Sequence, residues 1–272
     1  MRYAICNETF EGWEHARVCD YVASLGYTGL ELAPFTLAER ITDVSPAQRR
    51  QLRSTAERAG LQIIGLHWLL AKTTGLMLTS PDESVRQATA DYLVELARAA
   101  ADLGGDILVF GSPAQRRIPA GATPQQAMHW AVDTFRRAAP GLEATGVKLC
   151  VEPLAPPEAD FLTSAAEALT LIQQVASPAF RLHLDVKAMA AEPDDIPTLI
   201  HRHQAELYHF HANDPNKRGP GFGAVDFVPI FAALKAIGYK GWVSVEVFDY
   251  SPDPQTIATQ SLAYMRRCAG EA

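Results

Sequence analysis

The chain has 272 residues, a formal net charge of −7, and apolar side chains at 48% of its positions. This is the composition of a folded globular protein, and the acidic balance argues against a protein that grips the phosphate backbone of nucleic acid. The four cysteines are scattered without a CxxC pair, so neither a disulfide framework nor a zinc ribbon is expected. The longest apolar stretch, 63–71, is far shorter than the roughly 20 residues that cross a bilayer, and the first residues contain no apolar signal segment. We therefore expect a soluble, cytoplasmic protein with no membrane partner.

Short apolar strands alternate with longer helices in the first half of the chain. Two helix starts are marked by capping boxes, one in which Ser45 precedes Pro46 and Gln48 follows, and one built in the same way from Thr123 and Gln126. Glycines end each helix. The pattern predicts strands at Tyr3–Cys6, Gly29–Leu32, Gln62–Leu66 and Asp106–Phe110, and helices over 13–25, 46–60, 83–103 and 124–146.

The second half of the chain repeats this alternation. It predicts strands at Lys148–Glu152, Phe180–Asp185, Leu207–His211 and Trp242–Phe248, and helices over 164–175, 196–203, 227–237 and 254–265. Helices between successive strands force parallel pairing through right-handed crossovers. Eight such units, with no linker or low-complexity tract between them, predict a single (β/α)8 barrel domain over residues 1–272. The alternative is an open, doubly wound sheet.

Four potential metal ligands stand at equivalent places in four successive units. Glu152, Asp185, His211 and Glu246 lie at the ends of the last four predicted strands, 33, 26 and 35 residues apart. In a (β/α)8 barrel the active site lies at these carboxyl ends. Three converging carboxylates would repel one another, and a divalent cation removes that repulsion. Oxygen ligands with one imidazole favour Mn²⁺, Mg²⁺ or Co²⁺. The alternative is a set of salt bridges at the barrel rim.

Several stretches of the sequence resemble a known family. They are Val151-Glu152-Pro153, Leu184-Asp185, His209-Phe210-His211 with Pro220-Gly221-Phe222-Gly223, and Gly238-Tyr239-Lys240-Gly241 with Val245-Glu246. Nearly the whole chain is similar to the xylose-isomerase-like TIM barrels of the sugar phosphate isomerase/epimerase superfamily, and particularly to the ketose 3-epimerases. The resemblance implies one divalent cation per chain, most simply Mn²⁺, held by Glu152, Asp185, His211 and Glu246. It also implies a catalytic pair, Glu152 and Glu246, a substrate-binding Glu158, and a homo-oligomer.

The implied reaction is proton abstraction and return beside the carbonyl of a keto-sugar. The cation polarises the carbonyl and stabilises the enediolate, while one glutamate removes the proton and the other returns it. The chain departs from the epimerases at two substrate-contacting positions. Ala188 stands where they have a histidine, and Lys217, followed by Arg218, stands where they have an arginine. These departures leave the sugar and the carbon open.

Other strand-end side chains are candidate substrate contacts, each with a structural alternative. Glu31 and His67 could hydrogen-bond sugar hydroxyls, with Trp68 as an apolar platform, or His67 could be a satisfied core histidine. An arginine after the fourth strand, Arg116, could meet an anionic group bidentately or form a surface pair.

The last strands add further candidates. Lys187 would share the inward face of Asp185 if the strand persists, and could contact substrate. His183 and His209 lie two residues before a predicted ligand and could orient the metal ligands. The loop that carries Lys217 and Arg218 is rich in turn formers and would order over bound sugar. The loop after the eighth strand lacks glycines, so a phosphorylated substrate is not favoured.

Three other functions use a similar barrel. A keto-sugar or keto-inositol dehydratase or lyase would need the same enolisation and the same residues. An endonuclease-IV-like nuclease would need three zinc ions and a basic groove, which the net charge of −7 does not favour. A non-catalytic sugar-binding barrel would have no use for Glu152 and Glu246. We therefore expect a metal-dependent isomerase or epimerase whose partner is a small-molecule sugar and not nucleic acid.

Overall fold

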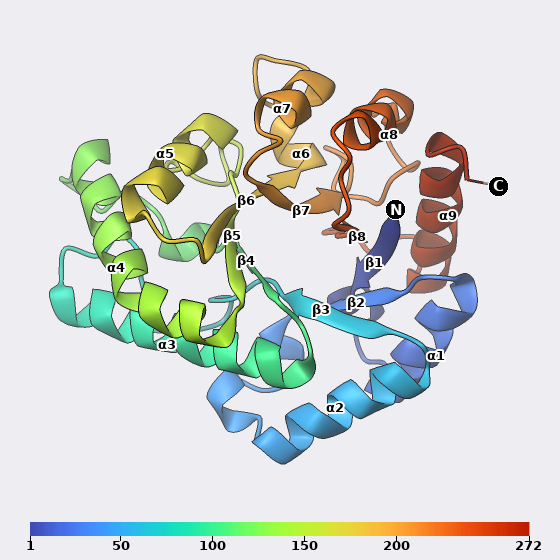
Figure 1. The fold of residues 1–272 in the computed structure, drawn as a ribbon, viewed down its shortest axis with the longest axis horizontal. Coiled ribbons are helices and arrows are strands. Elements are labelled where there is room, and N and C mark those ends of the chain that lie inside the picture. The colour runs from blue at the N-terminus through green and yellow to red at the C-terminus, as the bar shows by residue number, and fades with distance from the viewer. Residues whose placement is uncertain (272) are drawn as a thin grey trace.

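Eight parallel strands close into a barrel in the computed structural model, which describes residues 1–271. Each strand pairs with its sequence neighbours, and β1 pairs with β8 to close the ring. Figure 1 looks into this barrel, with the helices arranged around it. The predicted barrel is confirmed, and the open doubly wound sheet is wrong. The strands are β1 (Arg2–Cys6), β2 (Gly29–Leu32), β3 (Gln62–Leu66), β4 (Ile107–Phe110), β5 (Lys148–Val151), β6 (Phe180–Asp185), β7 (Leu207–Ala212) and β8 (Trp242–Val245).

The helices begin at the caps that the sequence marks. Ser45 Oγ accepts the Gln48 amide, while the Gln48 side chain accepts the Ser45 amide at 2.8 Å, and Thr123 and Gln126 do the same. These reciprocal bonds satisfy amides that a helix start leaves unpaired. The outer helices are α1 (His15–Leu25), α2 (Pro46–Arg58), α3 (Glu83–Leu103), α4 (Pro124–Thr145), α5 (Ala165–Val175), α7 (Ile196–Arg202), α8 (Phe227–Ala236) and α9 (Pro254–Cys268).

The predicted elements need two corrections. The eighth strand ends at Val245 and not at Phe248, because the backbone leaves the sheet at Glu246. A short helix that the pattern did not predict, α6 (Val186–Met189), follows β6 directly. Four 3₁₀ turns also follow strands or precede helices: η1 (Asn7–Phe10), η2 (Pro34–Thr36), η3 (Ile41–Asp43) and η4 (Pro113–Gln115).

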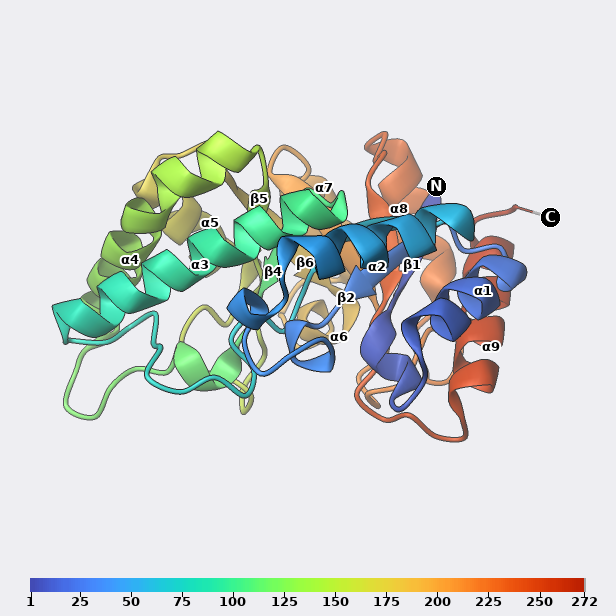
Figure 2. The same ribbon diagram turned by 90° about the horizontal axis from the view of Figure 1, so that it is seen from below.

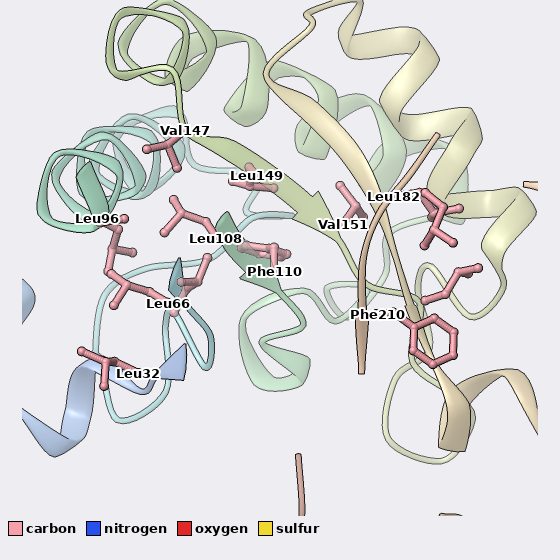
Figure 3. Packing of buried hydrophobic residues seen from close by; sticks show 14 of the residues in the cluster. Leu32, Leu66, Leu96, Leu108, Phe110, Val147, Leu149, Val151, Leu182 and Phe210 are labelled. Atoms are coloured by element: carbon pink, nitrogen blue, oxygen red, sulfur yellow. The ribbon is translucent and has the colours of Figure 1, made fainter. Parts of the chain in front are cut away.

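The core lies in two places because strand side chains alternate between faces. Leu108, Phe110, Leu149 and Val151 belong to the large apolar cluster that includes residues of the surrounding helices, and Figure 3 shows them beside Leu96 of α3. A smaller cluster fills the barrel itself and includes Ala4, Ile64, Val109, Cys150 and Trp242.

The loops that follow the strands are longer than the loops that lead into them, and they gather at one end of the barrel. Figure 2 shows them below the strands, with α6 among them, while the N-terminus lies at the upper end. This arrangement brings the carboxyl ends of all eight strands to one face. Within residues 1–271, no helix is both long and apolar enough to cross a membrane.

Candidate active site

A layer of polar side chains lies inside the barrel, between the smaller apolar cluster and the carboxyl ends of the strands. Glu152, Asp185, His211 and Glu246 come from the carboxyl ends of β5 to β8, and all four are buried. Ligand atoms of Glu152, Asp185, His211 and also His183 lie within 4.8 Å of one another. Glu246 adjoins this group because its Oε2 lies 3.1 Å from His211 Nδ1. The structure therefore brings together the four side chains that the sequence analysis selected as ligands.

Behind His211 lies a fully buried carboxylate. Glu31 Oε2 is 3.1 Å from His211 Nε2 and 3.0 Å from His209 Nε2. A carboxylate on the far nitrogen fixes the orientation of a metal-binding imidazole. Glu31 was predicted as a substrate contact; in the structure its side chain is 0% exposed and bonded to two histidines. His209 lies where an orienting residue would lie.

Asp185 is held on both oxygens. Oδ1 accepts the Ala188 amide at 2.8 Å as the N-cap of α6, and Oδ2 accepts the Asn213 side-chain amide at 2.5 Å. Asn213 Oδ1 in turn accepts the Lys187 amide. The sequence analysis missed Asn213, although it lies two residues beyond His211 on the predicted inward face.

Lys187 does not extend the inward face of β6. The strand ends at Asp185, and Lys187 lies in α6, where its Nζ is 2.8 and 2.7 Å from the two oxygens of Glu158. Its Nζ also lies 4.9 Å from the centre of the Phe248 ring. The predicted strand geometry is therefore wrong for Lys187, but the two predicted substrate contacts, Lys187 and Glu158, lie together as an ion pair.

His67 bridges two carboxylates. Its Nδ1 lies 3.1 Å from Glu246 Oε1, and its Nε2 lies 2.8 Å from Glu8 Oε2. Burial lowers the pKa of His67, but Glu8 and Glu246 outweigh this and hold the pKa well above its usual value. The bridge therefore orients Glu246 and leaves neither ring nitrogen free. The sequence analysis missed Glu8, since nothing in the pattern predicts that η1 turns it back over the barrel.

Glu152 is positioned by its neighbours in the loops after β4 and β5. Arg116 is completely buried and donates to the backbone carbonyls of Glu152 and Leu162. Arg116 was predicted as a substrate contact; in the structure its guanidinium tethers the loop after β5. A Cβ on Gly111 would lie 2.2 Å from Glu152 Oε2, so only glycine leaves room for this carboxylate.

Burial and the charges of neighbouring groups shift several pKa values in the cluster. Burial, together with Glu246 and Asp185, raises the pKa of Glu152 to about 8, and burial is also the main reason that the pKa of Asp185 is raised. Burial also acts to raise the pKa of Glu246, but His211 and His67 outweigh it and lower that pKa. Burial lowers the pKa of His183, whose ring nitrogens are buried without a hydrogen-bond partner.

These residues fit a divalent cation. Two buried carboxylates, Glu152 and Asp185, converge with His211 and His183, and Glu246 is bonded to His211. Burial and the neighbouring carboxylates raise the pKa of Glu152, and a cation would relieve the repulsion among these carboxylates. His183 Nε2 is unpartnered and lies 3.9 Å from Glu152 Oε1, so it offers a further donor at the same place. His183 was predicted to orient the ligands from behind. In the structure its ring lies within the ligand cluster itself.

The remaining predicted contacts lie in the outer loops. Trp68 is half-buried and packs against Phe35 and Phe248, with ring centroids 6.0 and 5.9 Å apart. The Lys217 side chain is exposed. Arg218 donates to Asp249 and Ser251 at 2.8 and 2.9 Å, which ties its loop to the loop after β8.

Together, the closed parallel barrel and the buried carboxylate–imidazole cluster at its carboxyl end define a (β/α)8 barrel with a candidate metal site where such barrels carry their active sites. The model of the xylose isomerase-like TIM barrel family matches residues 19–268, and the chain belongs to that family. The resemblance drawn from the sequence motifs is thereby confirmed.

Curated relatives and solved structures agree with this assignment. The chain is 29% identical to the D-psicose 3-epimerase of Ruminiclostridium cellulolyticum over 87% of its length and 81% of that protein. It is 27% identical to a putative hydroxypyruvate isomerase of Streptomyces coelicolor, over 89% of this chain and 87% of the other. The fold matches a crystal structure of D-psicose 3-epimerase with D-tagatose from Clostridium cellulolyticum H10, with a TM-score of 0.86, 23% identity, and coverage of 99% of each chain.

Proposed function

We propose that the protein is a divalent-metal-dependent isomerase or epimerase of a keto-sugar. One observation carries the proposal: Glu152, Asp185 and His211 converge at the carboxyl end of the barrel, with Glu246 bonded to His211. Relatives named as sugar epimerases and isomerases cover most of the chain, which supports an enzyme that acts on a sugar. They give no support to a nuclease, a dehydratase or a binding protein.

Glu152, Asp185, His211 and Glu246 would hold the cation. Their oxygen-rich set suits Mn²⁺ best among the ions considered, with Mg²⁺ or Co²⁺ as alternatives. When bound, the ion would act as a Lewis acid that makes the proton next to a sugar carbonyl easier to remove. Glu31 and Asn213 would keep His211 and Asp185 in place.

Glu152 and Glu246 would move the proton. They come from β5 and β8 and flank the ligands from β6 and β7, so they can face a bound sugar from two sides. One carboxylate takes the proton from the carbon beside the carbonyl, and the electron pair moves into the enediolate. The other carboxylic acid returns a proton to carbon, so the sugar leaves with its formula unchanged. His67 and His211 keep Glu246 ionised, so its carboxylate carries no proton at neutral pH.

The test is isotope exchange with metal-loaded protein. Metal analysis should find about one Mn²⁺, Co²⁺ or Mg²⁺ per chain, and keto-sugars incubated in D₂O should gain deuterium at a carbon next to the carbonyl. Glu152→Gln and Glu246→Gln should each lower exchange by roughly 10²-fold or more, since each removes a proton-transfer group. Exposed Glu39 provides a matched control, and Glu39→Gln should leave exchange unchanged.

Two results would contradict the proposal. One is unchanged exchange in both active-site variants, each verified as folded by circular dichroism. The other is a protein that binds no divalent ion on titration. A zinc content of two or three ions per chain would favour the nuclease instead.

A further inference from the structure

His183 is a buried histidine on β6 that has no hydrogen-bond partner. Its side chain is 0% exposed, and within residues 1–271 neither ring nitrogen is bonded to another group. The two histidines whose rings lie beside it differ, because His209 bonds to Glu31, and His211 bonds to Glu31 and Glu246. An imidazole has two polar nitrogens, and buried polar groups nearly always find partners. The unpartnered ring therefore indicates a ligand that binds at this place.

The two ring nitrogens of His183 lie at the candidate metal site. His183 is two residues before Asp185 on β6, so both side chains share the inward face of the strand. Its Nε2 lies 3.9 Å from Glu152 Oε1, and ligand atoms of His183, Glu152, Asp185 and His211 all lie within 4.8 Å of one another. Donors about 2.1 Å from one ion lie at most about 4.2 Å apart. Small side-chain movements would therefore let all four side chains reach the same ion.

An orienting role fits His183 less well than a role as a ligand. The residues that orient ligands in this site do so through hydrogen bonds, as Glu31 does with His211 and Asn213 does with Asp185. His183 makes no such bond to any described residue, since a separation of 3.9 Å from Glu152 exceeds the reach of a hydrogen bond. A ring that bonds to no ligand cannot fix the direction in which a ligand points.

A separate second ion is the other way to use the His183 ring. His183, His209 and His211 also offer ligand atoms within 4.8 Å of one another. The two nitrogens of His211, however, lie 3.1 Å from Glu246 Oε2 and 3.1 Å from Glu31 Oε2. An ion on the nitrogen beside Glu246 is the candidate ion itself, and an ion on the other nitrogen would displace Glu31. One shared ion therefore explains the unpartnered ring with fewer changes.

We infer that His183 is a fifth protein ligand of the cation, beside Glu152, Asp185, His211 and Glu246. The inference rests on the proposed function, which assigns the cation to this site. Two imidazoles favour a transition-metal ion over Mg²⁺, which prefers oxygen donors. A six-coordinate ion with five protein ligands keeps one position for the substrate. A sugar would therefore bind the ion through one oxygen and contact the protein with its others.

Counting the nitrogens on bound Mn²⁺ tests the inference without turnover. Electron spin echo envelope modulation of the Mn²⁺-loaded protein should detect two coordinated imidazole nitrogens in the wild type and one in His183→Leu. His183→Gln keeps polar atoms in the barrel and should lose the same nitrogen, so it serves as the second variant if leucine prevents folding. His209→Leu is the matched control, because it removes a buried histidine from the neighbouring strand, and it should keep both nitrogens.

Metal preference provides the second measurement. In calorimetric titrations, His183→Gln should lower the affinity for Co²⁺ by about tenfold more than the affinity for Mg²⁺, because nitrogen donors suit Co²⁺ better. A residue that only shaped the site would lower both affinities alike.

One nitrogen in the wild type, two nitrogens in the His183 variants, or equal losses of Co²⁺ and Mg²⁺ affinity would overturn the inference and leave the proposed function intact. A second Mn²⁺ per chain would overturn it in favour of a separate ion on the three histidines. The predicted nitrogen counts without exchange on any keto-sugar would support the inference and count against the proposed reaction. Failure to bind any divalent ion would overturn both.

Discussion

Single residues in this site act by controlling where the carboxylates lie. Gly111 leaves space for Glu152, Asn213 holds Asp185, and Glu31 orients His211. The sequence did not reveal these three roles, because each role depends on a neighbouring side chain from another strand. The candidate ligands themselves could be predicted, since a charged residue at the end of an apolar strand is unusual in any one repeat.

Replacement of Gly111 by alanine tests the space around Glu152. The added methyl group would lie 2.2 Å from Glu152 Oε2, so the carboxylate must move while the backbone can stay. We expect a folded protein whose metal affinity falls by about tenfold or more, measured by titration with Mn²⁺. Ala120→Ser adds one atom at an exposed position of the same loop and should have no effect. Unchanged affinity in the Gly111→Ala variant would show that Glu152 is not a ligand.

At the scale of elements, a change of strand register decides which histidines reach the site. Leu182 pairs with Leu207 and His183 with His209, so Tyr208 is an extra residue in β7. A bulge of this kind turns every later side chain to the other face. Without it His209 and His211 would point toward the helices. The alternation of the sequence shows that the two histidines share a face, but it does not show which face.

The junction of β7 with α6 should control metal affinity. Asn213→Ala removes the amide that donates to Asp185 and the oxygen that accepts the Lys187 amide. Loss of such an orienting partner costs roughly 10- to 100-fold in metal affinity. We expect that loss in a Mn²⁺ titration, together with recovery of activity at excess metal. The exposed Gln204 supplies the control, Gln204→Ala. Normal affinity of the Asn213 variant would remove this residue from the site.

At the scale of the whole molecule, the site costs stability when no cation is bound. The pKa of Glu152 is about 8 in the folded protein, against 4.5 for an ordinary glutamate. The folded state therefore keeps a proton that the unfolded chain has already released. The protonated carboxyl group of Glu152 therefore contributes to the stability of the folded state. This contribution is fully present below pH 4.5 and is lost as the pH rises through 8.

Thermal melting of the metal-free protein tests this linkage. Between pH 5 and pH 9, the Tm of the wild-type protein should fall relative to that of Glu152→Gln, which has no carboxyl group to titrate there. Saturating Mn²⁺ should reverse the trend, because the cation binds the ionised carboxylate. A constant Tm difference between the two metal-free proteins across this range would contradict the raised pKa.

Local signals in the amino-acid sequence were enough to predict the barrel and its candidate ligands. Capping boxes, terminal glycines and apolar strands are local signals, and eight alternating units leave few ways to fold. Other features came from the tertiary fold. It ended β8 at Val245, began α6 at Val186, and buried Glu31 and Arg116 behind other side chains. These features arise from contacts between residues far apart in the chain, which no local pattern encodes.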